Sequence, residues 1–431
     1  MKDIQVSGKR AQWGSSFGFI MASVGAAVGM GNIWGFPYKL GQGGGFVFLA
    51  LYLIIVLIAG VPILLAELSI GRATGLSPIL AYKRIHKKLG FVGVFNLLAC
   101  FLVLCYYSFF GGMLLQYMFS ELGFYTDAPV LWHLVFITMT AVIVMAGVEK
   151  GIEKSAVIMV PALILILVFI TIVTCSLPGA KRAFSFLFKP DFSKLNIKTL
   201  SMALTQVFFS LSLGQGCMIT YGSYLGKKES LVKSALLIPL FDTGTAVLAA
   251  MAIMPAVFSY GMSPATGPSL MFDIVPKVFS GMQGGRLLAV LFYFLVFLAA
   301  ITSAVSMLET LVSAVIEKGR VARRKAVGII SFLIALCGIP VCLSFGKNIW
   351  NLPMDFFELY EFISQYVLMT VCSLITCLAV VYIWKPKKAL PAALGQNSGV
   401  VGRLWFFLLK TVTPALLLYV ILSLFKFVKA A

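Results

Sequence analysis

Apolar runs of about twenty residues recur along the whole chain and are separated by shorter polar segments. A helix that crosses a lipid bilayer needs about 20 apolar residues. Eleven runs meet this length, and they begin at about residues 14, 44, 91, 130, 155, 200, 231, 286, 326, 356 and 404. The pattern predicts an all-α polytopic membrane protein with eleven transmembrane helices, in which residues 1–431 form a single transmembrane domain.

The composition and the positions of the charges support a membrane location. The chain has 431 residues, of which 60% are hydrophobic and 11% charged, whereas soluble domains carry about 25% charged residues. The net charge of +19 could suggest nucleic-acid binding, but the basic residues gather in alternate loops between the apolar runs. This alternation follows the positive-inside rule. We expect a multi-pass protein of the cell's inner (plasma) membrane, with a cytoplasmic N-terminus, an external C-terminus and the lipid bilayer, not nucleic acid, as its partner.

Two of the predicted helices contain glycines that would interrupt them. Four glycines lie within residues 25–35 of the first helix, and Gly214 and Gly216 lie in the middle of the sixth. A glycine weakens a helix by up to about 1 kcal/mol relative to alanine. These helices begin two five-helix halves, about residues 10–180 and about 198–385, with an extra helix at about 403–426. Interrupted helices in matching positions indicate an inverted-repeat transporter, and packing through small residues four apart is the alternative.

An interrupted membrane helix frees backbone groups that must find partners. Free carbonyl oxygens can replace the water around a small cation, and free amides at the positive end of a half-helix can hold a carboxylate. The same break can therefore bind Na⁺ and the carboxylate of an amino acid. Packing alone does not explain the polar residues Asn32, Ser210 and Ser212 beside the glycines.

The sequence does not favour an enzyme or a nucleotide-driven pump. Residues 14–18 match the G-x-S-x-G pattern of hydrolases, but they stand at the start of a membrane helix with no histidine nearby. No Walker loop occurs. Only two histidines, His86 and His133, are present. We therefore expect no catalytic residue, no nucleotide and no histidine-based metal site or proton relay.

Several segments resemble, in the right order, motifs of the neurotransmitter:sodium symporter family, especially its bacterial amino-acid branch. They are GAAVGMGNIWGFPY (25–38), GVPILLAELSIGR (60–72), CYYSFFGG (105–112), QVFFSLSLGQG with ITYGSY (206–224) and AAITSAVSM (299–307). The similarity runs from about residue 10 to about residue 425. It implies the leucine-transporter-type fold, a 5+5 inverted repeat with broken helices 1 and 6, and sodium-coupled import of an amino acid.

The resemblance implies two sodium sites. The first would use the carbonyl of Ala27, the side chains of Asn32 and Asp242, the carbonyl and hydroxyl of Ser210, and the carboxylate of the substrate. The second would be formed by the carbonyls of Gly25, Val28 and Ala299 and the hydroxyls of Thr302 and Ser303. Hard oxygen ligands of this kind suit Na⁺.

The resemblance also implies the substrate-binding residues, which are Ala27, Gly29, Met30, Gly31, Val103, Tyr107, Phe209, Ser210, Ser212, Gln215, Ser303 and Met307. Gly29 stands where amine-carrying relatives have an acidic residue, so the substrate should bring its own carboxylate. Val103, Phe209 and Met307 favour a neutral, hydrophobic side chain of medium or large size. Gln215 stands where many relatives have an apolar or aromatic residue. It suggests a substrate with some polar character, a pocket water, or an amide bonded to nearby backbone.

Gate residues are expected on both sides of the site. Tyr107 and Phe209 would close it from outside, and Arg10 would pair with Glu317 beside Trp13 at the inner gate.

The outer gate departs from the family pattern. Gly35 stands where relatives have an arginine that pairs with an acid on helix 10, and Asp355 matches that acid. Lys39, about one helical turn further on, is a candidate substitute for the arginine.

Asp242 bears on the use of chloride. A buried carboxylate is costly unless it is paired, and a bound Na⁺ would pair it. Chloride-dependent relatives lack a negative charge at this position and recruit Cl⁻, so we expect chloride independence.

We therefore expect alternating access, in which helices 1, 2, 6 and 7 rock against helices 3, 4, 8 and 9. Two alternatives stay open. One is a proton-coupled carrier of the same fold, although such carriers typically have a basic side chain near the position of Thr302 and Ser303. The other is a channel or a non-transporting amino-acid sensor. The sequence assigns no role to Glu309.

Overall fold

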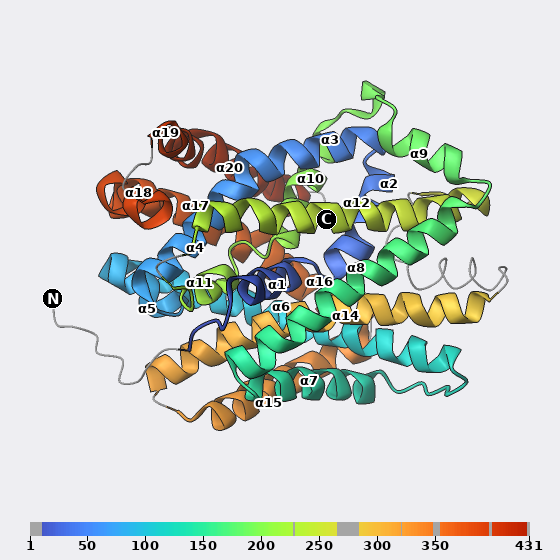
Figure 1. The fold of residues 1–431 in the computed structure, drawn as a ribbon, viewed down its shortest axis with the longest axis horizontal. Coiled ribbons are helices and arrows are strands. Elements are labelled where there is room, and N and C mark those ends of the chain that lie inside the picture. Colours follow the sequence, from blue (N-terminus) through green and yellow to red (C-terminus); the bar gives the residue numbers. More distant parts are fainter. Residues whose placement is uncertain are drawn as a thin grey trace.

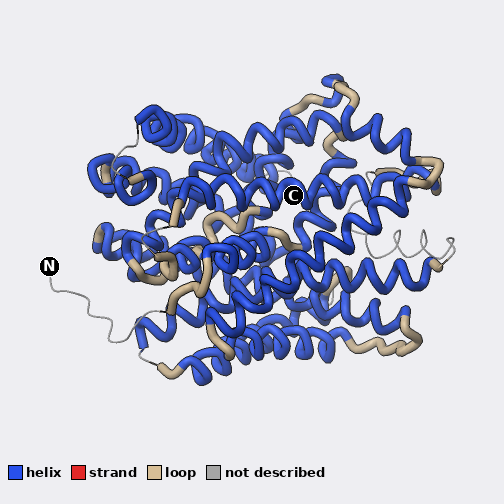
Figure 2. The backbone as a smooth tube through the Cα atoms, viewed as in Figure 1, coloured by secondary structure: helices blue, strands red, loops and turns tan. Residues whose placement is uncertain are grey.

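The computed structural model describes residues 11–226, 229–264, 284–319, 321–347, 354–395 and 399–428. All the regular structure within these residues is helical, and Figure 2 shows helices joined by loops. In this part of the chain eight helices are long and apolar enough to cross a membrane, or nine if the bent pair Ser16–Ala27 and Gly31–Gln42 forms one span. The prediction of an all-helical, multi-pass protein is confirmed, and the number of eleven spans stays a prediction.

The elements up to residue 175 are α1 (Ser16–Ala27), η1 (Gly31–Gly35), α2 (Phe36–Gln42), α3 (Phe46–Ile55), η2 (Val56–Gly60), α4 (Val61–Thr74), α5 (Pro78–Ile85), η3 (Lys87–Leu89), α6 (Gly90–Glu121), α7 (Pro129–Met145), η4 (Val148–Glu153) and α8 (Lys154–Cys175). The later elements are α9 (Ala180–Phe188), η5 (Phe192–Lys194), α10 (Ile197–Ser210), α11 (Cys217–Gly222), α12 (Leu231–Ser259), α14 (Gly285–Gly319), α15 (Arg323–Ser344), α16 (Phe356–Glu361), η7 (Phe362–Met369), α17 (Thr370–Leu378), η8 (Ala379–Trp384), α18 (Pro386–Leu394), α19 (Gly399–Phe407), η9 (Leu408–Val412) and α20 (Thr413–Val428).

Besides the bent first span, two predicted spans do not count among the long helices. The fourth corresponds to α7, which has 17 residues and is a shorter apolar helix. The sixth corresponds to α10 and α11, which are separated by residues 211–216. Neither half of this interrupted helix is long enough to cross a bilayer by itself.

The core of the molecule is built around α14. This helix packs against α1, α6, α7, α8 and α15. In its most apolar stretch 83% is buried, compared with 28% in the span Gly399–Ser423. The last span is therefore peripheral, and Figure 1 shows α19 at the edge of the helical assembly. The interrupted helices contact this core, because α1 and α11 both pack against α14.

Candidate substrate and ion site

The first helix is interrupted just where its glycines cluster. The α-helix α1 ends at Ala27, Val28 is extended (φ −70°, ψ 99°), and the helix resumes at Gly31. The two parts meet at an angle of 50°. The Gly29 amide donates to Oδ1 of Asn32 at 3.0 Å, so a side chain from the same element satisfies one of the freed backbone groups.

The break in helix 6 depends on glycine. Gly214 has φ 77°, and a Cβ there would lie 2.3 Å from the carbonyl oxygen of Met369. Only glycine meets both conditions at low cost. Oε1 of the buried Glu67 accepts a hydrogen bond from the Gly214 amide at 2.8 Å, and Asn96 donates to the Gly214 carbonyl. Glu67, on α4, thus contacts the unwound segment directly.

The two breaks face a common cavity of about 20 Å³. Its lining residues are Ala26, Ala27, Gly29, Gly31, Val103, Tyr107, Phe209, Ser210, Ser212, Gln215, Ser303 and Met307. Every predicted substrate residue except Met30 is in this set, and Ala26 is an addition. The amide of Met30 donates to the hydroxyl of Tyr107 at 3.0 Å, and Met30 lines a second cavity further out. Ser212 donates to the carbonyl of Ala26 at 3.1 Å and so joins the two breaks.

Asp242 lies at the centre of the predicted first sodium site. Its carboxylate accepts hydrogen bonds from Asn32 at 2.7 Å, from the Ser210 hydroxyl at 2.9 and 3.0 Å, and from the Tyr52 hydroxyl at 3.2 Å. Asp242, Asn32 and Tyr52 are fully buried, and Ser210 is nearly so. All three donors are neutral, and the ion pair between described residues does not include Asp242. A buried carboxylate without a cationic partner fits a site for a small cation. Tyr52 was missed because it stands outside the glycine-rich motifs.

The residues of the predicted second sodium site also lie together. The Ser303 hydroxyl donates to the carbonyls of Gly25 and Val28 at 3.1 and 3.3 Å. The Thr302 hydroxyl donates to the carbonyl of Ala299 at 3.1 Å and to that of Leu298 at 3.0 Å. Both hydroxyls can rotate, so the same oxygen atoms can face a cation.

A larger cavity of about 70 Å³ lies on the other side of Tyr107 and Phe209, which line both spaces. Its lining residues are Met30, Gly31, Trp34, Gly35, Tyr38, Lys39, Tyr106, Tyr107, Phe110, Gln206, Phe209, Phe357, Glu361 and Gln365. The Lys39 ammonium donates to Gln206 at 2.8 Å, and Gln206 donates to the carbonyl of Gly31 at 2.8 Å. On the opposite wall Gln365 donates to Glu361 at 3.3 Å. The two charged side chains face one cavity without forming an ion pair.

Asp355, the acid predicted at the outer gate, does not line this cavity, and its part in the gate stays a prediction. Asp355 caps the N-terminus of α16, where Oδ1 accepts the Glu358 amide at 2.8 Å and Oδ2 accepts the Gly346 amide at 3.2 Å. Each oxygen therefore accepts a hydrogen bond from a backbone group that does not line the cavity. Glu361, about two helical turns further along, is the acid that lines it.

The residues predicted at the inner gate contact several other elements. The indole of Trp13 donates to the carbonyl of Tyr221 at 3.1 Å and packs edge-on against the Tyr221 ring, with centroids 5.0 Å apart. Glu317 accepts hydrogen bonds from the amide and hydroxyl of Ser77. Arg10, its predicted partner, lies outside the described residues.

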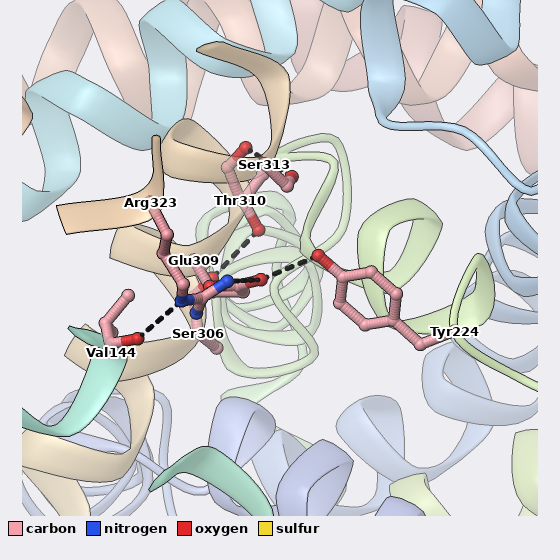
Figure 3. Close-up of polar contacts among 7 residues, drawn as sticks. All are labelled: Val144, Tyr224, Ser306, Glu309, Thr310, Ser313 and Arg323. Carbon is pink, nitrogen blue, oxygen red and sulfur yellow. Dashed lines mark hydrogen bonds and ion pairs between the residues drawn. The ribbon is translucent and has the colours of Figure 1, made fainter. Parts of the chain in front are cut away.

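Glu309 has a clear structural setting that the sequence did not give. Its buried carboxylate forms an ion pair with Arg323 and accepts the Tyr224 hydroxyl at 2.6 Å (Figure 3). Arg323 also donates to the carbonyl of Val144 at 2.8 Å. This network joins α14, α15 and α7 to the segment after α11. The sequence signal for this pair was limited to an acid in an apolar run, Glu309, that is followed by the basic segment containing Arg323.

The fold and the site define a multi-pass membrane transporter with paired breaks in two helices. The chain matches the sodium:neurotransmitter symporter family over residues 10–132 and 123–431. The chain belongs to this family, whose members are sodium-dependent transporters and not enzymes, so the resemblance noted in the sequence is confirmed.

Individual relatives are similar to this chain over nearly its full length. The chain is 35% identical to the sodium-dependent transporter YhdH of Bacillus subtilis, over 96% of this chain and 98% of the relative. It is 32% identical to a sodium-dependent transporter of Haemophilus influenzae, again over 96% and 98%. The solved structure of MhsT in complex with L-phenylalanine aligns with a TM-score of 0.90 at 35% identity, over 96% of this chain and all of that one.

Proposed function

We propose that the protein is a symporter that couples the import of a neutral amino acid to two sodium ions, without chloride, by alternating access. The observation that carries this proposal is the setting of Asp242. A buried carboxylate with only neutral donors lies directly beside a cavity lined by two helix breaks. A cation is required to make this burial favourable, and a substrate in the adjacent cavity would be close enough to share it.

The two ion sites would have different neighbours. The first, at Ala27, Asn32, Ser210 and Asp242, borders the substrate cavity and would be completed by the substrate carboxylate. The second is formed by backbone and hydroxyl oxygens only, with Ser303 as the residue that also lines the cavity. Supporting this assignment, every predicted ligand is an oxygen donor, which suits Na⁺.

The substrate would be a neutral amino acid. Among the described residues that line the cavity none is charged, so a charged side chain would have no counter-charge. The Tyr107 hydroxyl and the amides near Gly31 would hold the carboxylate. A Cβ on Gly29 would come within 2.5 Å of the Tyr107 hydroxyl, so a larger residue there would displace this group. The relative MhsT binds L-phenylalanine, which supports a hydrophobic amino acid as one candidate.

The gates would act in turn on the two sides of the cavity. Phe209 and Tyr107 separate it from the outer cavity, where Lys39 and Glu361 would attract each other on closure. Arg10 and Glu317, with Trp13, would close the inner side. The two halves, about residues 10–180 and 198–385, would form the inverted repeat, with the N-terminus in the cytoplasm of a cell whose inner membrane holds the protein.

Uptake into proteoliposomes tests the proposal. We expect a mixture of labelled neutral amino acids to accumulate under an inward Na⁺ gradient but not under an equal K⁺ gradient, with gluconate able to replace chloride. Accumulation driven by a pH gradient alone would instead support the proton-coupled carrier. Sodium-dependent binding without accumulation would support the sensor.

A further inference from the structure

We propose that Gln215 makes the substrate cavity select neutral amino acids whose side chain carries an amide or a hydroxyl over apolar side chains of the same shape. This inference rests on the proposed function and narrows its substrate class.

The position of Gln215 is fixed by the backbone around it. Gly214 and Gly216, its neighbours, have φ of 77° and 79°, a conformation that favours glycine. Gln215 is 2% exposed and lines the cavity. Because the turn is held on both sides, the amide has a defined place in the cavity wall.

The amide of Gln215 is bonded only weakly. Nε2 donates to Sδ of Met369 at 3.3 Å, and Oε1 accepts from Sγ of Cys217 at 3.8 Å. Sulfur is a poor acceptor and a poor donor, whereas a primary amide offers two N–H groups and two lone pairs. No hydrogen bond to a nitrogen or an oxygen atom is formed by Gln215 with the described residues. A buried amide in this state gains free energy when a stronger partner arrives.

The hydroxyl hydrogens of the three serines that line the cavity already have acceptors. Ser210 donates to Asp242, Ser212 to the carbonyl of Ala26, and Ser303 to two carbonyls of helix 1. The Tyr107 hydroxyl is assigned to the carboxylate in the proposed function. Gln215 is therefore a lining side chain whose N–H donors are accepted by no oxygen atom of the described residues, so they are available to a polar group on the substrate side chain.

The cavity can adapt to such a side chain. Its free space of about 20 Å³ holds little more than one water molecule. Met307 lines it and Met369 touches the amide of Gln215, and methionine side chains change shape readily. A substrate amide or hydroxyl would replace the sulfur contacts of Gln215 by stronger hydrogen bonds. A site built in this way discriminates against an analogue that lacks the group.

Competition between isosteric pairs tests the inference. Threonine against valine, and glutamine against methionine, would compete for sodium-driven uptake in proteoliposomes containing the full chain. We expect the polar member of each pair to be preferred by about tenfold in the wild type, which corresponds to about 1.4 kcal/mol. Gln215→Leu and Gln215→Met should each bring the ratio to about one or reverse it, while uptake of the apolar member stays sodium-dependent. Gln116→Leu, on α6 outside both cavities, is the matched control and should leave the ratios unchanged.

The preference of the wild-type protein within each pair of amino acids tests the inference even if one Gln215 variant does not fold. A preference for valine and methionine in the wild type, unchanged in the Gln215 variants, would overturn the inference and leave the proposed function intact. Equal competition within each pair, again unchanged by the substitutions, would overturn it too, because the amide would then serve only Met369, Cys217 or a water. Absence of any sodium-dependent amino-acid uptake would overturn both proposals.

Discussion

Single residues at this site are most informative where a charge has no opposite charge beside it. Asp242 accepts hydrogen bonds from Asn32, Ser210 and Tyr52, and none of these donors carries a charge. Neutral donors reduce the cost of burying a carboxylate but do not cancel its charge. The fully buried Ala246, one helical turn along α12, offers no second acid. The negative charge of the ion site therefore depends on Asp242.

Asp242→Asn removes this charge and keeps the shape of the side chain. We expect the sodium concentration that gives half-maximal uptake to rise about tenfold or more, or uptake to become stimulated by chloride, because an anion would then supply the missing charge. Initial uptake rates over a range of sodium concentrations, with chloride or gluconate, measure both effects. Asp191→Asn in the exposed segment after α9 is the control. Unchanged sodium and chloride dependence in Asp242→Asn would rule out this role.

At the scale of the element, the buried carboxylate of Glu153, the last residue of η4, holds the N-terminal end of α1. Glu153 accepts the Gly14 amide at 2.7 Å and the Ser15 hydroxyl at 2.8 Å. A Cβ on Gly18 would lie 1.9 Å from the Glu153 carboxylate, so the glycine is needed for this close approach. The start of α1 must move if the inner side opens, and these contacts would have to break first.

Glu153→Gln weakens the contact to the Gly14 amide, because a hydrogen bond to a charged group contributes about 1.5–3 kcal/mol and a neutral one less. We expect amide hydrogen exchange at the start of α1 to become about five- to thirtyfold faster. Hydrogen–deuterium exchange by mass spectrometry on peptides covering residues 13–22 measures this. Glu149→Gln, an exposed acid on η4, should leave exchange unchanged. Equal rates in the two variants would show that Glu153 does not hold the helix.

Comparison of the elements shows what the sequence could predict. The residues that line the cavity were almost all expected from the sequence. Short motifs such as residues 25–38 and 206–216 fix where each residue stands relative to the helix breaks. Asp355 was assigned to the gate because it matches the acid that family members have on helix 10. In the structure it caps α16, and Glu361 is the acid that lines the cavity. The partners of Lys39 and Glu309 were not predictable, since Gln206 and Arg323 meet them only through tertiary packing.

At the scale of the whole molecule, charges are distributed between two ends of the helical assembly. Lys39 and Glu361 face the outer cavity and are held apart by Gln206 and Gln365. Glu309 and Arg323, near the Trp13 side, are already paired. Within the described residues, Glu309 and Arg323 form an ion pair, whereas Lys39 and Glu361 do not.

Substituting the outer pair tests its contribution to transport. Lys39→Met and Glu361→Gln should each lower the maximal uptake rate about five- to tenfold, because closure would lose an attraction between opposite charges in a site with little water. The reciprocal variant Lys39→Glu with Glu361→Lys should recover part of the rate. Lys189→Met, at an exposed position after α9, is the control. If the reciprocal variant takes up substrate no faster than either single variant, Lys39 and Glu361 do not pair during transport.

Breaking the ion pair between Glu309 and Arg323 should lower the stability of the protein. Removing one partner of a buried ion pair typically costs about 3–5 kcal/mol, so we expect Arg323→Met to lower the thermal midpoint of the purified protein markedly. Glu309→Gln with Arg323→Met should be less harmful than the sum of the single variants. Fluorescence-detected thermal unfolding in detergent measures the cycle, and Arg324→Met, its exposed neighbour, is the control. If the decrease in thermal midpoint of the double variant equals the sum of the decreases of the single variants, Glu309 and Arg323 have no coupling energy.

The carboxylate of Asp242 also determines how much charge would cross the membrane in each cycle. Asp242 belongs to the chain and is not carried, and a zwitterionic amino acid has no net charge, so two sodium ions would move two positive charges with no anion to cancel them. Each charge gains about 2.3 kcal/mol across 100 mV, so the voltage alone would support an accumulation of about 2,000-fold. Uptake would then appear as an inward current that grows as the membrane hyperpolarises, twice that of a carrier moving the same cargo together with one chloride.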